Sequence, residues 1–206
     1  MYRELNNKQY NIIIGLILLW GFAVNAIMCV FFQDVFLTWN TTTVLIGYFV
    51  AAIIGICMST FSDNPIVSFM GYNLVVLPIG VVLSISVKDY YVSSIVQAFI
   101  LTTLITVLMI IISTIKPEIF ESLGSTLFIC LSGVIVLELI MMIIGVSTPQ
   151  WWDWVVALLF CGYIGYDWSK AQERDRTLDN AVDSAVDLYL DIINLFVRLL
   201  GSKDDD

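Results

Sequence analysis

Residues Tyr189–Phe196 read YLDIINLF, a run of side chains apolar enough for a lipid bilayer that encloses one carboxylate, Asp191. A charged side chain at membrane depth costs about 2.5 to 3.5 kcal/mol on insertion scales, so it marks a functional site by default. This run belongs to the last of seven apolar segments in the chain. Asp191 is therefore the leading candidate for a functional residue, and it needs a partner or an aqueous path.

The composition indicates a multi-pass membrane protein. Of the 206 residues, 59% are hydrophobic and 13% are charged, whereas a soluble domain has about 45 to 50% apolar and 25% charged residues. A helix needs about 20 apolar residues to cross the hydrocarbon core. We predict an all-α fold, a single integral membrane domain over residues 1–206, with seven transmembrane helices at about 11–32, 42–60, 66–87, 92–115, 119–146, 151–168 and 182–200.

The basic residues indicate an orientation. With the amino terminus in the cytoplasm, six basic residues lie inside and three lie outside, in agreement with the positive-inside tendency. The inside set is Arg3, Lys8, Lys116, Lys170, Arg174 and Arg176, and the outside set is Lys88, Arg198 and Lys203. Together with the short loops, this favours a bacterial plasma membrane with a cytoplasmic amino terminus.

Charge and cysteine content exclude several classes of function. The net charge of −9 argues against nucleic acid as a partner, and ten of the eighteen acidic residues lie between Asp167 and Asp206. The four cysteines fall within apolar runs without a close pair, and the chain has no histidine to complete a zinc or iron site. We expect the lipid bilayer as the main partner and no tightly bound cofactor.

Acidic residues recur every four positions before and within the last apolar run: Asp175, Asp179, Asp183, Asp187 and Asp191. This spacing keeps neighbours on one face of a helix. We expect Asp175 and Asp179 to be solvated. Asp187 and Asp191 lie among apolar residues, so their face must turn toward protein or a water-filled cavity. The alternative for Asp191 is a simple hydrogen bond to a neighbouring helix, with Asn194 as a second polar contact.

Two further acids and one base are unusual. Asp167 lies in the sequence GYDW, where the sixth run leaves the membrane. Glu138 lies in the middle of the fifth run. It could line an ion pathway together with Asp187 and Asn194, relay protons or remain protonated in the core. Arg198 follows Asp191 by seven residues, and we expect it to extend to the membrane surface; the alternative is that it neutralises Asp191.

Two patterns together, Tyr166-Asp167 and LYLDIINLF at Leu188–Phe196, resemble the Bax-inhibitor family, also called the transmembrane Bax-inhibitor-motif (TMBIM) family. The resemblance implies a helical bundle with the seventh helix at its centre. It also implies a proton-sensitive Ca²⁺ leak, with Ca²⁺ as the permeant ion. The residues matching the family's pH-sensing pair are Asp167 and Asp191, which would also contact Ca²⁺ transiently.

The chain departs from the family pattern at the second run. Family members carry a basic residue there that latches to the aspartate pair, but Met58–Phe61 contains neither arginine nor lysine. Lys170 and Arg174 are the candidate replacements. An acid that some relatives carry in this run is also absent.

Physical chemistry makes such a pair a plausible switch. Two carboxylates in a low-dielectric site cannot easily both ionise, so protons bind to the pair as a unit. Carboxylates are also the hard oxygen ligands that Ca²⁺ prefers, and few of them suit a leak because tight binding would block exit. Protonation removes an attractive charge but also releases a closing contact, so the direction of the pH response stays open.

Three other functions compete with the leak. One is a non-conducting regulator of protein partners such as proteases or cell-death factors, whose identity the sequence does not give. Another is an intramembrane aspartyl protease, but these enzymes carry Gly-x-Gly-Asp where this chain has LYLD at Leu188–Asp191. The last is a proton-coupled transporter, for which Pro78 is the one mid-segment proline. We expect the protein not to be an enzyme.

Overall fold

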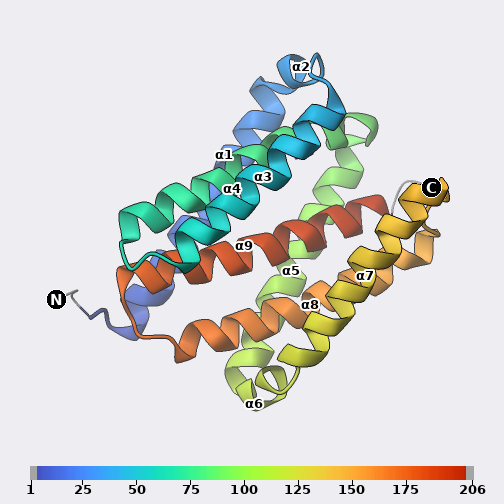
Figure 1. Ribbon diagram of the computed structural model, residues 1–206. Helices are drawn as coiled ribbons and strands as arrows, with labels where there is room; N and C mark the ends of the chain where they lie inside the picture. Colours follow the sequence, from blue (N-terminus) through green and yellow to red (C-terminus); the bar gives the residue numbers. More distant parts are fainter. Residues whose placement is uncertain (1–3, 203–206) are drawn as a thin grey trace. The chain divides into compact units, whose positions relative to one another are not determined.

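The computed structural model describes residues 4–202, which form nine α-helices, one short 3-10 helix and no strand (Figure 1). Arg3, Lys203 and the acidic residues Asp204–Asp206 lie outside the described residues. The helices are α1 (Asn7–Phe31), α2 (Gln33–Phe36), α3 (Thr41–Thr60), α4 (Pro65–Ser86), η1 (Val87–Asp89), α5 (Val92–Ile115), α6 (Pro117–Glu121), α7 (Gly124–Ile144), α8 (Gln150–Glu173) and α9 (Leu178–Gly201). The predicted all-helical fold is confirmed.

Turn residues set the helix boundaries. The Asn40 side chain caps α3 by accepting a hydrogen bond of 3.0 Å from the Thr43 amide, and Asn64 caps α4 by accepting one of 3.0 Å from the Ile66 amide. Pro65 and Pro117 begin α4 and α6, positions where the missing N–H of proline costs nothing. The predicted starts of the runs at about 42 and 66 agree with the observed starts of α3 and α4.

Five helices are long and apolar enough to cross a membrane: α1, α3, α4 together with η1, α5 and α7. These segments make the chain a multi-pass membrane protein by length and composition. The predicted sixth and seventh spans correspond to α8 and α9, which are more polar, so the count of seven stays a prediction. The run predicted at 119–146 is divided into α6 and α7 by a turn at Ser122 and Leu123.

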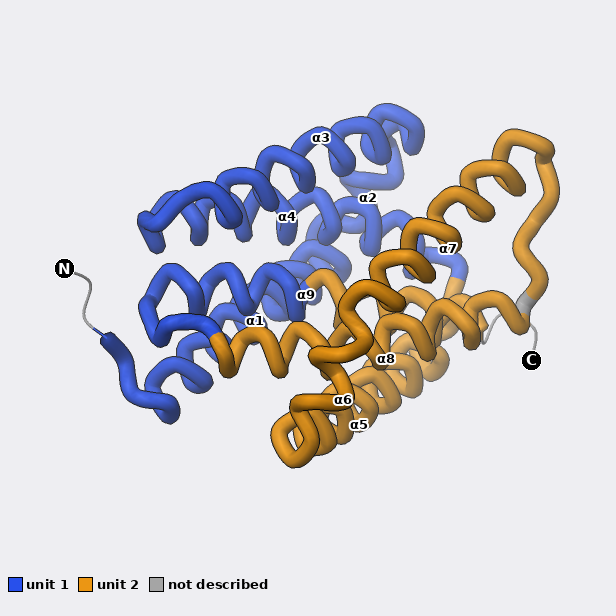
Figure 2. Tube along the Cα trace, turned by 60° about the horizontal axis from the view of Figure 1, so that its bottom comes forward, with its two compact units in different colours: residues 1–89, 174–189 blue, residues 90–173, 190–206 orange. Residues whose placement is uncertain are grey.

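The chain forms two compact units, shown in different colours in Figure 2. Unit 1 comprises residues 1–89 and 174–189, and unit 2 comprises residues 90–173 and 190–206. Helix α9 contributes its first half to unit 1 and its second half to unit 2. The two units are described separately below.

In unit 1, helix α4 packs against α1 and α3 (Figure 1). The contact between α3 and α4 is close because Gly55 and Gly71 face each other. A Cβ atom on either glycine would lie 2.5 Å from the carbonyl oxygen of the other. Small residues that let helix backbones approach are a typical device of membrane helix packing.

In unit 2, helix α8 packs against α5, α6 and α7. Gly165 of α8 lies so close to the ring of Phe120 in α6 that an added Cβ would overlap it. Helix α7 ends at Gly145, whose φ of 71° is left-handed and therefore suits glycine. These contacts position the part of α8 that carries Asp167.

Candidate functional site

Asp191 is buried in unit 2, with 6% of its surface exposed. Asp167, also in unit 2, is half-buried on α8. Tyr163, one turn before Asp167, lies within electrostatic range of both carboxylates. Asp191 of α9 and Asp167 of α8 therefore both lie within electrostatic range of the Tyr163 phenol.

Hydrogen bonds on both sides of Asp167 fix helix α8. The Ser113 hydroxyl donates to the Gly165 carbonyl oxygen at 2.6 Å, and the Trp168 indole donates to the Thr114 hydroxyl at 2.9 Å. One turn later, the Ser169 hydroxyl donates to a Glu121 carboxylate oxygen at 3.1 Å. Because α5 supplies two of these partners, the rotation of α8 about its axis is set by polar contacts as well as by packing.

Asn194 follows Asp191 on α9 but bonds within its own helix. Its amide nitrogen donates to the Leu190 carbonyl oxygen at 2.7 Å. This contact satisfies one amide donor without a neighbouring helix. The expectation of Asn194 as a polar contact between helices finds no support in this bond.

Glu138 and Arg198 belong to a network of charges in unit 2. The Arg198 guanidinium lies 2.7 Å from one Glu138 oxygen and 3.0 Å from an Asp153 oxygen. The Trp152 indole donates to Glu138 at 2.9 Å. Two carboxylates from α7 and α8 thus hold the Arg198 side chain, and the expectation that it extends to the membrane surface stays a prediction.

The two candidate latch residues have carboxylate partners of their own. In unit 2, the Lys170 ammonium lies 2.7 Å from Glu173 and 5.9 Å from the centre of the Tyr166 ring. In unit 1, the Arg174 guanidinium lies 2.9 Å from Asp187. The structure thus joins Asp187 to the connection between α8 and α9, a role that the spacing of the acids does not reveal.

Arg174 also donates to Ser184 at 3.1 Å, and Ser184 in turn lies 3.0 Å from the Tyr10 hydroxyl of α1. Although burial disfavours a charged guanidinium, Asp187 and its hydrogen bond raise the pKa of Arg174 above its ordinary value. The arginine therefore stays charged, and it ties the start of α9 to the preceding connection.

Asp179 and Asp183 lie in unit 1 and have serine partners from α4 and α3. The Ser68 hydroxyl donates to Asp179 at 2.7 Å, and the Ser59 hydroxyl donates to Asp183. Asp179 has 7% of its surface exposed, so the expectation that it is solvated is wrong, whereas Asp175 is exposed as expected. The physical reason is that a donor 111 positions away replaces water around the carboxylate.

Sequence reasoning missed the two serines, although a signal was present. Ser59 follows Gly55 by four residues, and Ser68 precedes Gly71 by three residues. Each serine therefore shares a helix face with a glycine at the contact of α3 with α4.

Within residues 4–202, no group of three or more histidine, cysteine, aspartate or glutamate side chains is arranged to hold a metal ion. Four acids of unit 2 occur in two sets: Asp167 with Asp191 around Tyr163, and Glu138 with Asp153 around Arg198. The second set is neutralised in part by its arginine.

Comparison with known proteins gives one family over nearly the whole chain. Residues 3–202 match the family model described as Inhibitor of apoptosis-promoting Bax1. Protein LIFEGUARD 3 of Arabidopsis thaliana is 40% identical over 83 residues, covering 39% of this chain and 33% of the relative. Protein LIFEGUARD 4 of the same plant is 38% identical over 112 residues, covering 52% and 44%.

An animal relative gives a similar match. Protein lifeguard 4 of Mus musculus is 32% identical over 126 residues, covering 55% of this chain and 48% of the relative. The chain thus spans between a third and a half of the length of these curated relatives.

Proposed function

The chain belongs to the Bax-inhibitor, or TMBIM, family of membrane proteins, and on this premise we propose that it forms a pH-sensitive Ca²⁺ leak gated by Asp167 and Asp191. The observation that carries the proposal is the burial of Asp191 in unit 2, within electrostatic range of the same tyrosine as Asp167. A carboxylate that has left water and has a second one nearby binds protons differently from an exposed acid.

The pair acts as the pH sensor in this proposal. Two carboxylates that share a low-dielectric site repel each other when both are ionised, so one proton is retained by the pair. A change in pH then alters the charge of the site by one unit. That change alters the attraction for Ca²⁺ and the contact between α8 and α9 at the same time.

The pair also supplies the ion contacts. Ca²⁺ takes oxygen ligands, and two carboxylates with water offer fewer than the six to eight oxygens of a storage site. A weak site of this kind lets the ion leave as well as enter. Glu138 and Asp187 are each paired with an arginine, so we assign them to stabilisation of the bundle and not to ion conduction.

The test is Ca²⁺ flux into liposomes that contain only the purified protein and a trapped indicator dye. We expect Asp167→Asn and Asp191→Asn each to flatten the dependence of flux on pH. Asp175→Asn is the matched control, because Asp175 is an exposed aspartate on the connection between α8 and α9, and it should leave the dependence unchanged. Equal effects of all three substitutions would indicate a diffuse electrostatic attraction for Ca²⁺ and not gating by the specific pair.

A second candidate is a non-conducting regulator of protein partners. The description of the family as an inhibitor of Bax1 favours it, because that wording names an action on a protein and not on an ion. If the protein gives no more Ca²⁺ flux than empty liposomes at any pH, the regulator function is favoured over the leak.

We also propose a plasma membrane location with the amino terminus in the cytoplasm. The support is the distribution of basic residues, six of nine on the cytoplasmic side. A reporter enzyme that is active only in the cytoplasm, fused to the amino terminus, should be active; the same reporter fused in the loop at Lys88 should be inactive.

A further inference from the structure

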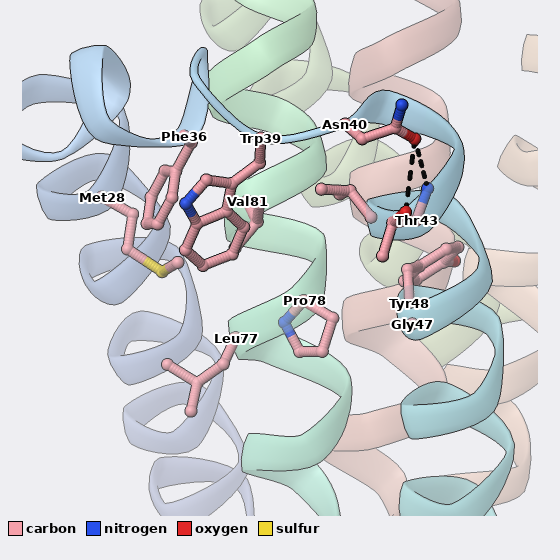
Figure 3. Close-up of a pocket in the computed structure, with 11 residues that line it drawn as sticks. Met28, Phe36, Trp39, Asn40, Thr43, Gly47, Tyr48, Leu77, Pro78 and Val81 are labelled. Atoms are coloured by element: carbon pink, nitrogen blue, oxygen red, sulfur yellow. Dashed lines mark hydrogen bonds between the residues drawn. The ribbon is translucent and has the colours of Figure 1, made fainter.

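Unit 1 contains a cavity of about 620 Å³ at the end where α1 finishes and α3 begins. Figure 3 shows it between Met28 of α1, Phe36 of α2, the start of α3, and Pro78 and Val81 of α4. The cavity opens on the surface of unit 1, so a ligand can enter it from outside.

The lining of the cavity selects an apolar occupant. At the start of α3 the Asn40 side chain accepts hydrogen bonds from the Thr43 amide at 3.0 Å and the Thr43 hydroxyl at 3.3 Å (Figure 3), and Tyr48 lies further along the same helix. Toward the middle of α4 the lining is Leu77, Pro78 and Val81. Bound water needs two to four polar partners, which this part of the cavity does not offer.

The volume fits a flexible chain. An apolar cavity of about 150 Å³ holds one benzene molecule, so 620 Å³ corresponds to roughly four such volumes. The lining includes residues one turn apart on α4, Leu77 and Val81, and on α3, Val44 and Gly47. An alkyl chain matches this volume and the apolar side chains that α4 contributes.

The bilayer is the source of such a chain. The walls come mainly from α3 and α4, two of the helices able to cross a membrane. The cavity is open at its side, because Trp39 is 50% exposed and Leu77 is 47% exposed. We propose that this cavity binds one acyl chain of a membrane phospholipid, with its glycerol end at Trp39 and Asn40.

Trp39 supports this direction of the chain. Its indole packs edge-on against the Phe36 ring, with ring centres 5.2 Å apart (Figure 3). Tryptophan is favoured at the boundary between headgroups and hydrocarbon. The end of the cavity with Trp39 and Asn40 thus lies at the interface, and the end with Leu77 lies in the hydrocarbon.

Gly47 allows the cavity to be filled without disturbing the fold. A Cβ atom on Gly47 meets no atom within 4 Å, and the residue lines the cavity. Gly15 of α1 is also exposed within a helix and has nothing within 4 Å of an added Cβ, but it does not line the cavity. Gly47→Phe and Gly15→Phe are therefore a matched pair.

The experiment titrates the purified protein in detergent micelles with a phospholipid that carries dibrominated acyl chains, and follows quenching of tryptophan emission. We expect quenching of the wild type to saturate near one phospholipid per chain. Trp39→Phe should lose the saturable part, Gly47→Phe should weaken the apparent affinity at least tenfold, and Gly15→Phe should match the wild type.

Several results would overturn the proposal. One is quenching that rises without saturation in the wild type, and another is saturable quenching that persists in Trp39→Phe, which places the chain elsewhere. The proposal would also be overturned if Gly47→Phe bound the phospholipid as tightly as the wild type while its helix content equalled that of Gly15→Phe. If quenching saturated with a brominated free fatty acid but not with the phospholipid, the ligand would be a free fatty acid and not a phospholipid.

Discussion

Substitution of Arg198 by methionine removes the positive charge of the network in unit 2 and keeps most of the side-chain volume. The side chains of Arg198, Glu138 and Asp153 are 23%, 28% and 20% exposed. Exposed ion pairs contribute about 0.2 to 1 kcal/mol, and breaking a fully buried pair costs about 3 to 5 kcal/mol. For a network of intermediate burial that leaves two carboxylates without their base, we expect Arg198→Met to destabilise the protein by about 2 to 3 kcal/mol.

This loss corresponds to a factor of roughly 30 to 150 in the unfolding equilibrium constant. Equilibrium unfolding in mixed detergent micelles, followed by tryptophan emission, measures it. Lys170→Met is the matched control, because the pair of Lys170 with Glu173 is 40% and 47% exposed, and its loss should destabilise the protein much less than Arg198→Met.

A double-mutant cycle isolates the contact between Arg198 and Glu138. Glu138→Gln keeps the shape of the side chain and an oxygen for the Trp152 indole, so we expect a coupling energy of about 1 to 2 kcal/mol with Arg198→Met. The reasoning would be refuted if Arg198→Met cost no more than Lys170→Met, since the guanidinium would then act as a surface charge.

Two other substitutions test the packing of unit 1. Ser68→Ala removes the donor to the buried carboxylate of Asp179, so we expect a loss of about 1 to 3 kcal/mol in the same unfolding assay; a loss below 0.5 kcal/mol, on the order of a surface change, would show that water replaces the serine. Gly55→Ala places a Cβ atom 2.5 Å from the Gly71 carbonyl oxygen and should cost about 1 to 3 kcal/mol, whereas Gly15→Ala should change stability by less than about 1 kcal/mol. Equal effects of the two alanines would contradict the close approach of α3 and α4.

The helices and their boundaries follow from local features, which is why the sequence predicts them well. The predicted run at 92–115 coincides with α5, and the caps at Asn40 and Asn64 begin α3 and α4. Apolar composition and capping residues act over a few positions and can be read directly. The turn at Ser122 and Leu123 between α6 and α7 was not predicted, because it lies inside the run predicted at 119–146.

The side-chain partners follow from tertiary packing, which spacing does not encode. Asp179 belongs to the regular series of acids, yet its donor Ser68 comes from α4, and the burial that results contradicts the expected solvation. Arg198 has a partner 60 positions away in Glu138. Asp191 was singled out correctly as buried because a charge in an apolar run has few alternatives.

The measurement that tests the account most directly is Ca²⁺ flux against pH in proteoliposomes for the wild type, Asp167→Asn, Asp191→Asn and the double variant. If the two carboxylates bind protons as one unit, each single substitution should flatten the pH dependence, and the double variant should match the single ones. A pH dependence that survives in Asp191→Asn, or that falls by separate additive steps in the three variants, would contradict gating by the pair.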